Sequence, residues 1–170
     1  MIARVAAALM LALPAAGAAA QDLGGQQDEV VATYGDWDIR CTPNRDVCVM
    51  HQVGKGAEGN NVLEVRIRKL SGVTADNGQP IPAAIQVAAP LGVLLQQGVR
   101  IQVDGGRTVA MPFQICVQGG CLARDAVPSP LLESMKAGRT ARMTIASPQG
   151  EVPVNISLSG FTRSFSELRP

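Results

Sequence analysis

The sequence is dominated by short β-type segments separated by turn signals. From Val30 onward, Val, Ile and Thr alternate with polar residues or form short apolar runs, and Gly, Pro, Asn or Asp interrupts them about every ten residues. The segments that we predict as strands are Thr33–Arg40, Val47–Val53, Val62–Leu70, Ala83–Ala88, Val99–Val103, Thr108–Met111, Phe113–Val117, Leu122–Ala126, Thr140–Ile145 and Val152–Ser159. The pattern predicts an all-β fold, an antiparallel β-sandwich or barrel-like domain.

One segment has a helical pattern instead. In Ser129–Gly138, Ser129 suits the N-cap, and Pro130 suits the first helical position, where its missing N–H costs nothing. Gly138 suits the left-handed residue that commonly ends a helix. The predicted apolar face comprises Leu131, Leu132 and Met135. A helix of about two turns is unstable alone, so we expect this face to pack on the sheet.

Two of the four cysteines, Cys116 and Cys121, lie in a predicted hairpin. If residues 118–119 form a two-residue turn, with a glycine supplying the positive φ angle, Cys116 lies directly opposite Cys121. The Cα atoms of such a pair are about 4.5 Å apart, which is within the reach of a disulfide.

The other pair follows the same logic, because a four-residue loop at Pro43–Asp46 brings Cys41 opposite Cys48. Four cysteines allow three pairings, and in this one both bridges are local. We therefore predict the disulfides Cys41–Cys48 and Cys116–Cys121. Each closes a small loop, so each should stabilise the fold by only about 2 kcal/mol.

Two chemical roles for these cysteines fit less well. A thioredoxin-like redox site has two residues between its cysteines, at a helix N-terminus, whereas both gaps here are longer and lie between strands. A zinc site has at least one pair separated by two to four residues, a limit that Cys116 and Cys121 just reach and Cys41 and Cys48 do not.

Residues 1–20 have the three parts of a secretory signal peptide. A basic start at Arg4 precedes the apolar run Val5–Leu13, and Ala18 and Ala20 form a small-x-small cleavage site. The apolar run is shorter than the roughly 20 residues that a membrane-spanning helix needs. We therefore expect the mature protein to be periplasmic or secreted, in an oxidising compartment where disulfides persist.

After cleavage we expect a flexible leader, residues 21–29, followed by a single β domain, residues 30–170. Cleavage would remove one of the 15 basic residues and none of the 14 acidic ones, leaving 14 of each sign. A neutral chain with few aromatic residues is unlike a nucleic-acid-binding protein. The sequence predicts no nucleic-acid partner and no integral membrane segment after signal cleavage.

The chain has a single histidine, His51, in a strand-like run. It contains no G-x-S-x-G, H-E-x-x-H or Walker motif. Asp36 and Asp38 flank Trp37, a pattern typical of a strand whose tryptophan faces inward and whose acids face solvent. The sequence predicts no catalytic residue, no metal ligand and no cofactor. A hydrolase that pairs His51 with a distant carboxylate is the remaining enzymatic alternative.

Several motifs, taken in order and spacing, resemble the invasion-associated locus B family of secreted alphaproteobacterial proteins. They are YGDWDIRC (34–41), CVMHQ (48–52), APLGVLLQQGVRIQVDGG (89–106), FQICVQGGCLA (113–123), the helix with Leu132, Met135, Lys136 and Gly138, and SLSGFTRSFSEL (157–168). The resemblance implies an all-β, extracytoplasmic domain with disulfides. Some members are linked with virulence through the entry of bacteria into host cells. The resemblance implies no catalytic residue in this sequence.

Our leading hypothesis is a non-enzymatic secreted or periplasmic protein that binds a protein or host-surface partner and contributes to host-cell invasion. The alternative is a periplasmic envelope-maintenance or small-ligand-binding protein. The sequence assigns no binding residue and no oligomeric state.

Overall fold

The computed structural model describes residues 28–170. The predicted signal peptide and residues 21–27 of the predicted leader lie outside this range, and Glu29, the last leader residue, begins the first strand. The strands are β1 (Glu29–Tyr34), β2 (Trp37–Cys41), β3 (Cys48–Lys55), β4 (Asn61–Lys69), β5 (Ala83–Ala89), β6 (Val99–Val103), β7 (Thr108–Met111), β8 (Phe113–Val117), β9 (Gly120–Val127), β10 (Thr140–Ser147) and β11 (Gly150–Ser157). The helices are α1 (Ser129–Ala137) and α2 (Phe161–Glu167), with a 3₁₀ turn, η1 (Leu95–Gln97).

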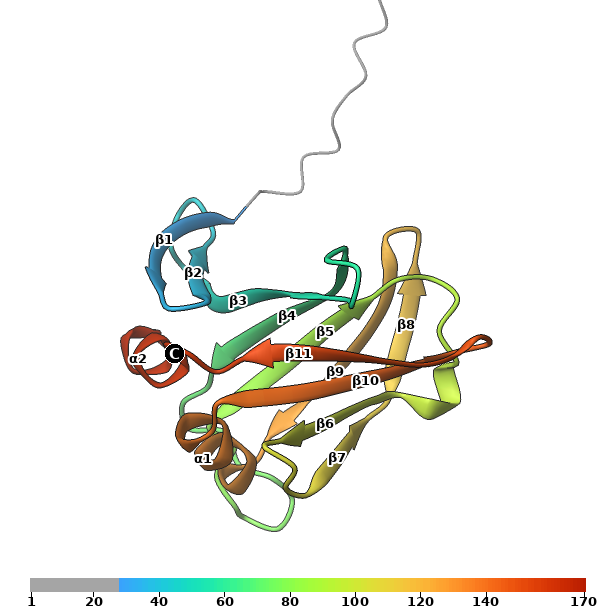
Figure 1. Ribbon diagram of the computed structural model, residues 1–170. Helices are drawn as coiled ribbons and strands as arrows, with labels where there is room; N and C mark the ends of the chain where they lie inside the picture. Colours follow the sequence, from blue (N-terminus) through green and yellow to red (C-terminus); the bar gives the residue numbers. More distant parts are fainter. Residues whose placement is uncertain (1–27) are drawn as a thin grey trace, which may run out of the picture.

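All strands pair antiparallel in one sheet, with the order β7-β6-β10-β11-β3-β4-β5-β9-β8 (Figure 1). The two end strands, β7 and β8, are consecutive in the chain and only Pro112 separates them. Because the chain itself joins the two ends of the order, the sheet forms a nearly closed barrel. Of the two predicted architectures, the barrel-like one is therefore confirmed.

Two features break the regularity of the barrel. The β1–β2 hairpin branches from the ring, because β2 pairs with β3 outside the main order. On the same edge β3 meets β11 through one residue pair, Lys55 with Asn155, and the strands then diverge where β2 begins to pair with β3. The polar cavity described below opens at this divergence.

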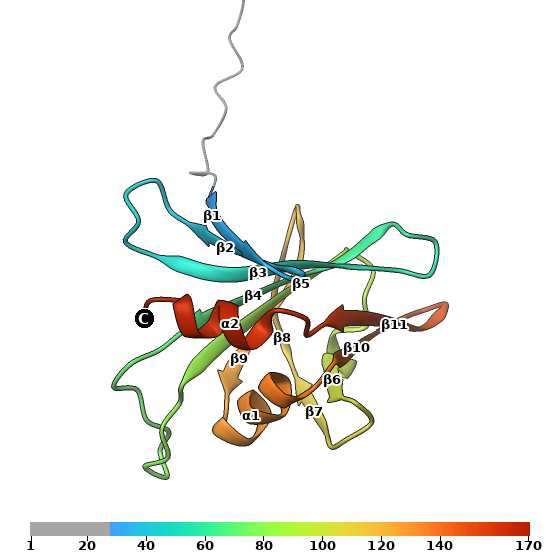
Figure 2. The same ribbon diagram turned by 60° about the vertical axis from the view of Figure 1, so that its left-hand side comes forward.

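Side chains that alternate along the strands fill one hydrophobic core, which both helices cover at one end of the barrel (Figures 1 and 2). Helix α1 buries Leu131, Leu132 and Met135, as predicted. The ring of Trp37 is fully buried and meets Phe161 of α2 edge to face, with centroids 5.3 Å apart. No helix within the described range has the length and apolarity needed to cross a bilayer.

The predicted strand Thr33–Arg40 is wrong in one respect, because it is a hairpin. Gly35 adopts a φ of 59° in the turn between β1 and β2, and Tyr34 pairs with Trp37 across it. Alternation of polar and apolar residues continues on both sides of the turn, so the sequence resembles one strand. The prediction that Trp37 faces inward is confirmed.

The helix predictions also need correction. Pro128, not Ser129, is the N-cap of α1, and Gly138 is extended, with a φ of −82°. Backbone N–H groups of Arg139 and Thr140 donate to the Asp104 carboxylate at 2.8 and 2.9 Å, which leads the chain straight into β10. The second helix, α2, was not predicted.

Both predicted disulfides are present. Cys41–Cys48 joins β2 to β3 with a Cα separation of 4.1 Å, and Cys116–Cys121 joins β8 to β9 with a separation of 3.9 Å. Each bridge links residues that pair directly across a hairpin, as expected. The positive φ angle at the second hairpin belongs to Gly120, outside the two-residue turn.

Candidate functional site

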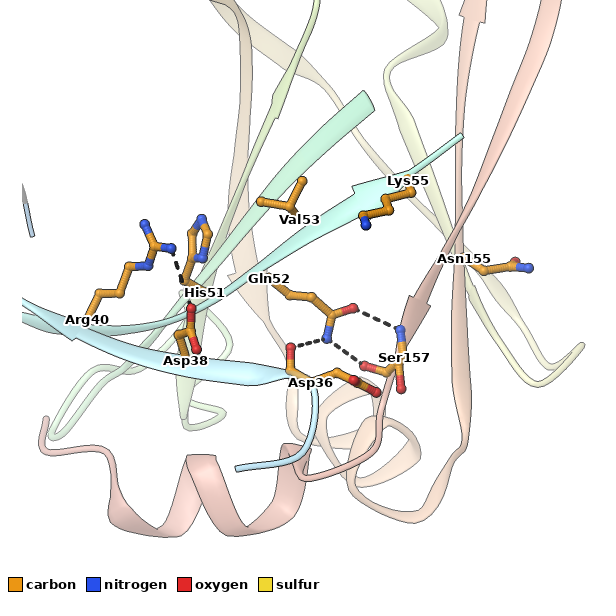
Figure 3. Close-up of a pocket in the computed structure, with 9 residues that line it drawn as sticks. All are labelled: Asp36, Asp38, Arg40, His51, Gln52, Val53, Lys55, Asn155 and Ser157. Carbon is orange, nitrogen blue, oxygen red and sulfur yellow. Dashed lines mark hydrogen bonds and ion pairs between the residues drawn. The ribbon is translucent and has the colours of Figure 1, made fainter. Parts of the chain in front are cut away.

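A polar cavity of about 470 Å³ opens beside the point where β3 and β11 diverge (Figure 3). Strand β3 supplies much of its wall, the β1–β2 turn and β2 supply a second part, and β11 supplies the third. The lining residues are Asp36, Asp38, Arg40, His51, Gln52, Val53, Lys55, Asn155 and Ser157. The cavity thus contains the only histidine of the chain, together with groups of both charges.

His51 stands on the outer face of the sheet, paired in register with Asp38 of β2 and Arg66 of β4. Its side chain is only 5% exposed, and its Nε2 lies 3.2 Å from Glu64 Oε1. Burial lowers the pKa of His51, the positive charges of Arg40 and Arg66 add to this effect, and Glu64 opposes it. The imidazole is therefore neutral at pH 7 despite its carboxylate neighbour.

Glu64 in turn belongs to a chain of ion pairs on the same face. Arg66 Nε donates to Glu64 Oε1 at 2.6 Å, and Arg66 Nη1 donates to Asp28 at 2.9 Å. Burial alone would raise the pKa of Glu64, but the hydrogen bond and charge of Arg66 outweigh it and lower that pKa. The carboxylate stays ionised and is committed to Arg66 and His51.

Gln52 points to the opposite side of β3 and connects three segments (Figure 3). Its Nε2 donates to the carbonyl oxygens of Asp36 and Ser157 at 2.9 and 3.0 Å, and its Oε1 accepts from the backbone N–H of Ser157 at 2.9 Å. These bonds join the β1–β2 turn to the end of β11, where the sheet lacks a regular ladder. Gln52 is therefore a structural crosslink beneath the cavity.

Arg40 is the least satisfied member of the cavity. Its Nη2 lies 3.4 Å from Asp38, but its Nε is buried and has no partner among the described residues. A buried donor without an acceptor is costly.

The structure gives His51 a neighbouring carboxylate, Glu64, that sequence reasoning did not identify as its partner. Within residues 28–170, no hydroxyl or thiol donates a hydrogen bond to His51, all four cysteines are in disulfides, and no cluster of three metal-ligating side chains occurs. None of the cysteines lines the cavity. The arrangement can hold a polar ligand near Arg40, but its acid–base pair is engaged internally.

Sequence reasoning missed Arg40, Gln52 and Glu64 as parts of one site. These residues come close together only through the register of β2, β3 and β4. That register places Arg40 and His51 on neighbouring strands and Glu64 next to Arg66. The alternation in β4 was the available signal, because it placed Glu64, Arg66 and Arg68 together on the outer face.

Comparison with known proteins supports the resemblance drawn from the motifs. A family model described as invasion associated locus B (IalB) protein matches residues 37–169. Two curated relatives, the invasion protein B homologs of Brucella abortus strain 2308 and of Brucella abortus biovar 1 strain 9-941, are each 28% identical over 163 residues, which covers 93% of this chain and 90% of the relative. These relatives are named as invasion proteins and not as enzymes.

A solved structure has the same fold. The crystal structure of invasion associated protein B from Bartonella henselae matches with a TM-score of 0.61 and 25% sequence identity, over 79% of this chain and 92% of that one. The family model covers most of the chain, and the solved structure repeats its architecture. On this evidence the chain belongs to the invasion associated locus B family.

Proposed function

We propose that this protein is a non-enzymatic, periplasmic or secreted binding protein that contributes to the invasion of host cells. The main observation behind this proposal is that the charged groups around His51 are paired with one another. Glu64 is bound by His51 and Arg66, and Arg66 is bound by Asp28. A general acid or base must reach a reacting group, whereas these atoms contact one another. The names of the relatives support the role in invasion.

The disulfides support a location outside the cytoplasm. Both bridges close short surface hairpins, and such bonds persist in oxidising compartments. The signal-peptide pattern of residues 1–20 points to the same location.

Strand β8 offers a surface for a protein partner. It stands at one end of the strand order and exposes Ile115 and Val117, with exposed fractions of 52% and 50%. These side chains flank the Cys116–Cys121 bridge, which holds the hairpin in one register. Apolar side chains on a rigid strand at the edge of a sheet are a common feature of protein-contact surfaces.

The test combines cell fractionation with host-cell assays. The protein should be found outside the cytoplasm with at least part of it in the secreted fraction, and the processed, purified protein should bind host cells saturably. Deletion of its gene should lower invasion, and complementation should restore it. Complementation with Ile115→Ser/Val117→Ser should fail, whereas Val30→Ser/Val31→Ser, which alters exposed apolar residues of β1, should succeed. Absence of binding together with unchanged invasion would refute the proposal.

The second candidate is a periplasmic small-ligand-binding or envelope-maintenance protein. The specific observation in its favour is the 470 Å³ cavity itself, whose lining includes Arg40, an arginine with one ion pair, 3.4 Å to Asp38, within residues 28–170. Cavities of this size accommodate small ligands. Fractionation separates the two candidates, because a protein retained wholly in the periplasm has no access to a host cell.

A further inference from the structure

We propose that the outer face of β4, β5 and β9 carries a binding site for a phosphate monoester. The inference rests on the binding role proposed above and names a ligand class for it. The site is a groove of about 530 Å³, separate in its lining residues from the His51 cavity. We call it the arginine groove and define it by Arg66, Arg68, Gln86, Gln114 and Arg124.

The strand register brings the arginines together. Arg66 pairs with Gln86 of β5, and Gln86 pairs with Arg124 of β9, so the three residues form one row across neighbouring strands (Figure 1). Neighbouring strands are about 4.8 Å apart, which puts Arg66 and Arg124 about 10 Å apart at the backbone. Arg68 is two residues along β4 on the same face. All three arginines line the same groove, which has room for one small ligand.

The arginines of the groove are incompletely neutralised. Arg66 uses Nε and Nη1 for Glu64 and Asp28, which leaves Nη2. Arg124 donates only to a neutral acceptor, from its Nε to Gln86 Oε1 at 2.7 Å. Within residues 28–170, neither Arg68 nor Arg124 has a carboxylate within ion-pair distance. Three arginines thus line one groove, and two of them have no ion pair within residues 28–170.

The remaining lining contributes amide groups and little negative charge. Gln114 Nε2 donates to the carbonyl oxygen of Arg124 at 3.0 Å, which ties β8 to the groove. The single acidic residue of the lining, Asp125, accepts a hydrogen bond from the backbone N–H of Ala126 at 2.7 Å. Three apolar residues, Val49, Ala84 and Ile85, complete the lining. Because Arg66 is already paired with Glu64 and Asp28, the positive charge of the groove comes from Arg68 and Arg124, opposed only by Asp125 within the lining.

This donor set favours a phosphate monoester over other anions. A guanidinium group binds phosphate or carboxylate through two parallel N–H donors. A carboxylate offers two oxygens and one charge, and a phosphodiester carries one charge. A phosphate monoester carries about −1.5 to −2 at neutral pH and three terminal oxygens, which matches two unpaired guanidinium groups. The volume exceeds that of a bare phosphate and leaves room for the esterified group.

The ester can come from a small soluble molecule or from the headgroup of a lipid. The test therefore uses the processed protein, with its disulfides intact, and two probes. Glycerol 3-phosphate titrated by calorimetry represents the soluble source. Phosphatidylcholine vesicles containing phosphatidic acid represent the lipid source, with phosphatidylglycerol vesicles as the phosphodiester control. We expect saturable binding of at least one monoester probe that weakens as salt is added.

The variants Arg68→Gln and Arg124→Gln should each weaken binding about tenfold, because each removes a charged hydrogen-bond donor pair. The matched control is Arg142→Gln, which removes an exposed arginine from β10 that also has no ion pair among the described residues. All three variants should unfold at the wild-type temperature, since these side chains lie outside the core.

Three results would refute the proposed phosphate monoester site in the arginine groove. These are no binding of either monoester probe, equal binding of succinate or phosphatidylglycerol, and equal weakening by Arg142→Gln. Host-cell binding measured on the same samples keeps the two proposals apart. If the ester fails to bind and host cells are still bound, only the groove is refuted. If the ester binds, host cells are not bound and gene deletion leaves invasion unchanged, the invasion role is refuted and the ligand site stands.

Discussion

Substituting Gly160 by alanine should destabilise the fold far more than a glycine-to-alanine change normally does. Gly160 precedes α2 with a φ of 81°, and a Cβ there would overlap the carbonyl oxygen of Tyr34 in β1. The β1–β2 turn and the start of α2 would have to separate. That movement disturbs the edge-to-face contact of Trp37 with Phe161 and the hydrogen bond from Trp37 Nε1 to the carbonyl oxygen of Ser157.

The magnitude follows from these parts. A left-handed alanine costs about 1–2 kcal/mol, an aromatic pair contributes about 0.5–1.5 kcal/mol, and a buried hydrogen bond contributes about 1 kcal/mol. Together they give a loss of about 3–4 kcal/mol in the free energy of unfolding. For a domain of this size that loss lowers the melting temperature by roughly 10 °C.

Gly72→Ala is the matched control. Gly72 has a φ of 70°, and a Cβ there would meet no atom within 4 Å. The control therefore carries only the backbone cost of about 1–2 kcal/mol. Guanidinium unfolding of both variants, followed by tryptophan fluorescence, measures the difference. If Gly160→Ala costs no more than Gly72→Ala, the close approach of Gly160 to Tyr34 is not part of the folded state.

Three further predictions follow from the bridges and the polar groups. Reduction of both disulfides should lower the free energy of unfolding by about 4 kcal/mol, at about 2 kcal/mol for each short loop, as thermal unfolding with and without a reductant will show. Acid should destabilise the protein as pH falls below 6.5, because the pKa of His51 is lower in the folded state and the unfolded state therefore takes up the proton first. The pKa of Glu64 is also lower in the folded state, so a further loss of stability should begin below pH 4.5. His51→Gln should abolish the first of these losses in a pH titration of stability and leave the second. Gln52→Leu should cost about 2–3 kcal/mol because it leaves the backbone N–H of Ser157 without its acceptor, and amide exchange at Ser157 should accelerate.

Local patterns in the sequence predicted most strands, α1 and both disulfides, because each of these depends on neighbours in the chain. Cys116 faces Cys121 through a two-residue turn, and the apolar stripe of α1 lies within nine residues. Closure of the barrel was not predictable in the same way. It depends on a bend at Pro112 that moves the chain from one neighbour, β6, to another, β9.

The missed elements also have physical causes. Helix α2 has seven residues and no side-chain N-cap, so its helical propensity is weak and packing decides its conformation. The spacing of Phe161 and Phe165 was the available signal, since these residues share the buried face of the helix. The turn at Gly35 was hidden because its two strands continue one alternating pattern.

Three of the motifs that reveal the family, YGDWDIRC, CVMHQ and SLSGFTRSFSEL, meet at one junction of the fold. Trp37 and Gln52 both bond to the carbonyl oxygen of Ser157, Phe161 packs on Trp37, and Gly160 lies against the β1–β2 turn. The side chains of Trp37, Gln52 and Phe161 are buried, and all are engaged inside the protein. They therefore specify how the hairpin, β11 and α2 meet, and they are unavailable to a partner.

The residues that we expect to bind a ligand lie elsewhere, on the outer face of β4 and β9. Arg68 and Arg124 are exposed and take no part in the core, so their replacement should change binding and leave stability unaltered. Gly160→Ala should do the reverse, lowering stability while the folded fraction still binds the monoester. Because the two kinds of residue can be perturbed separately, family membership and ligand choice are separable properties of this chain. We expect the junction residues to determine stability and the charge of the arginine groove to determine ligand binding.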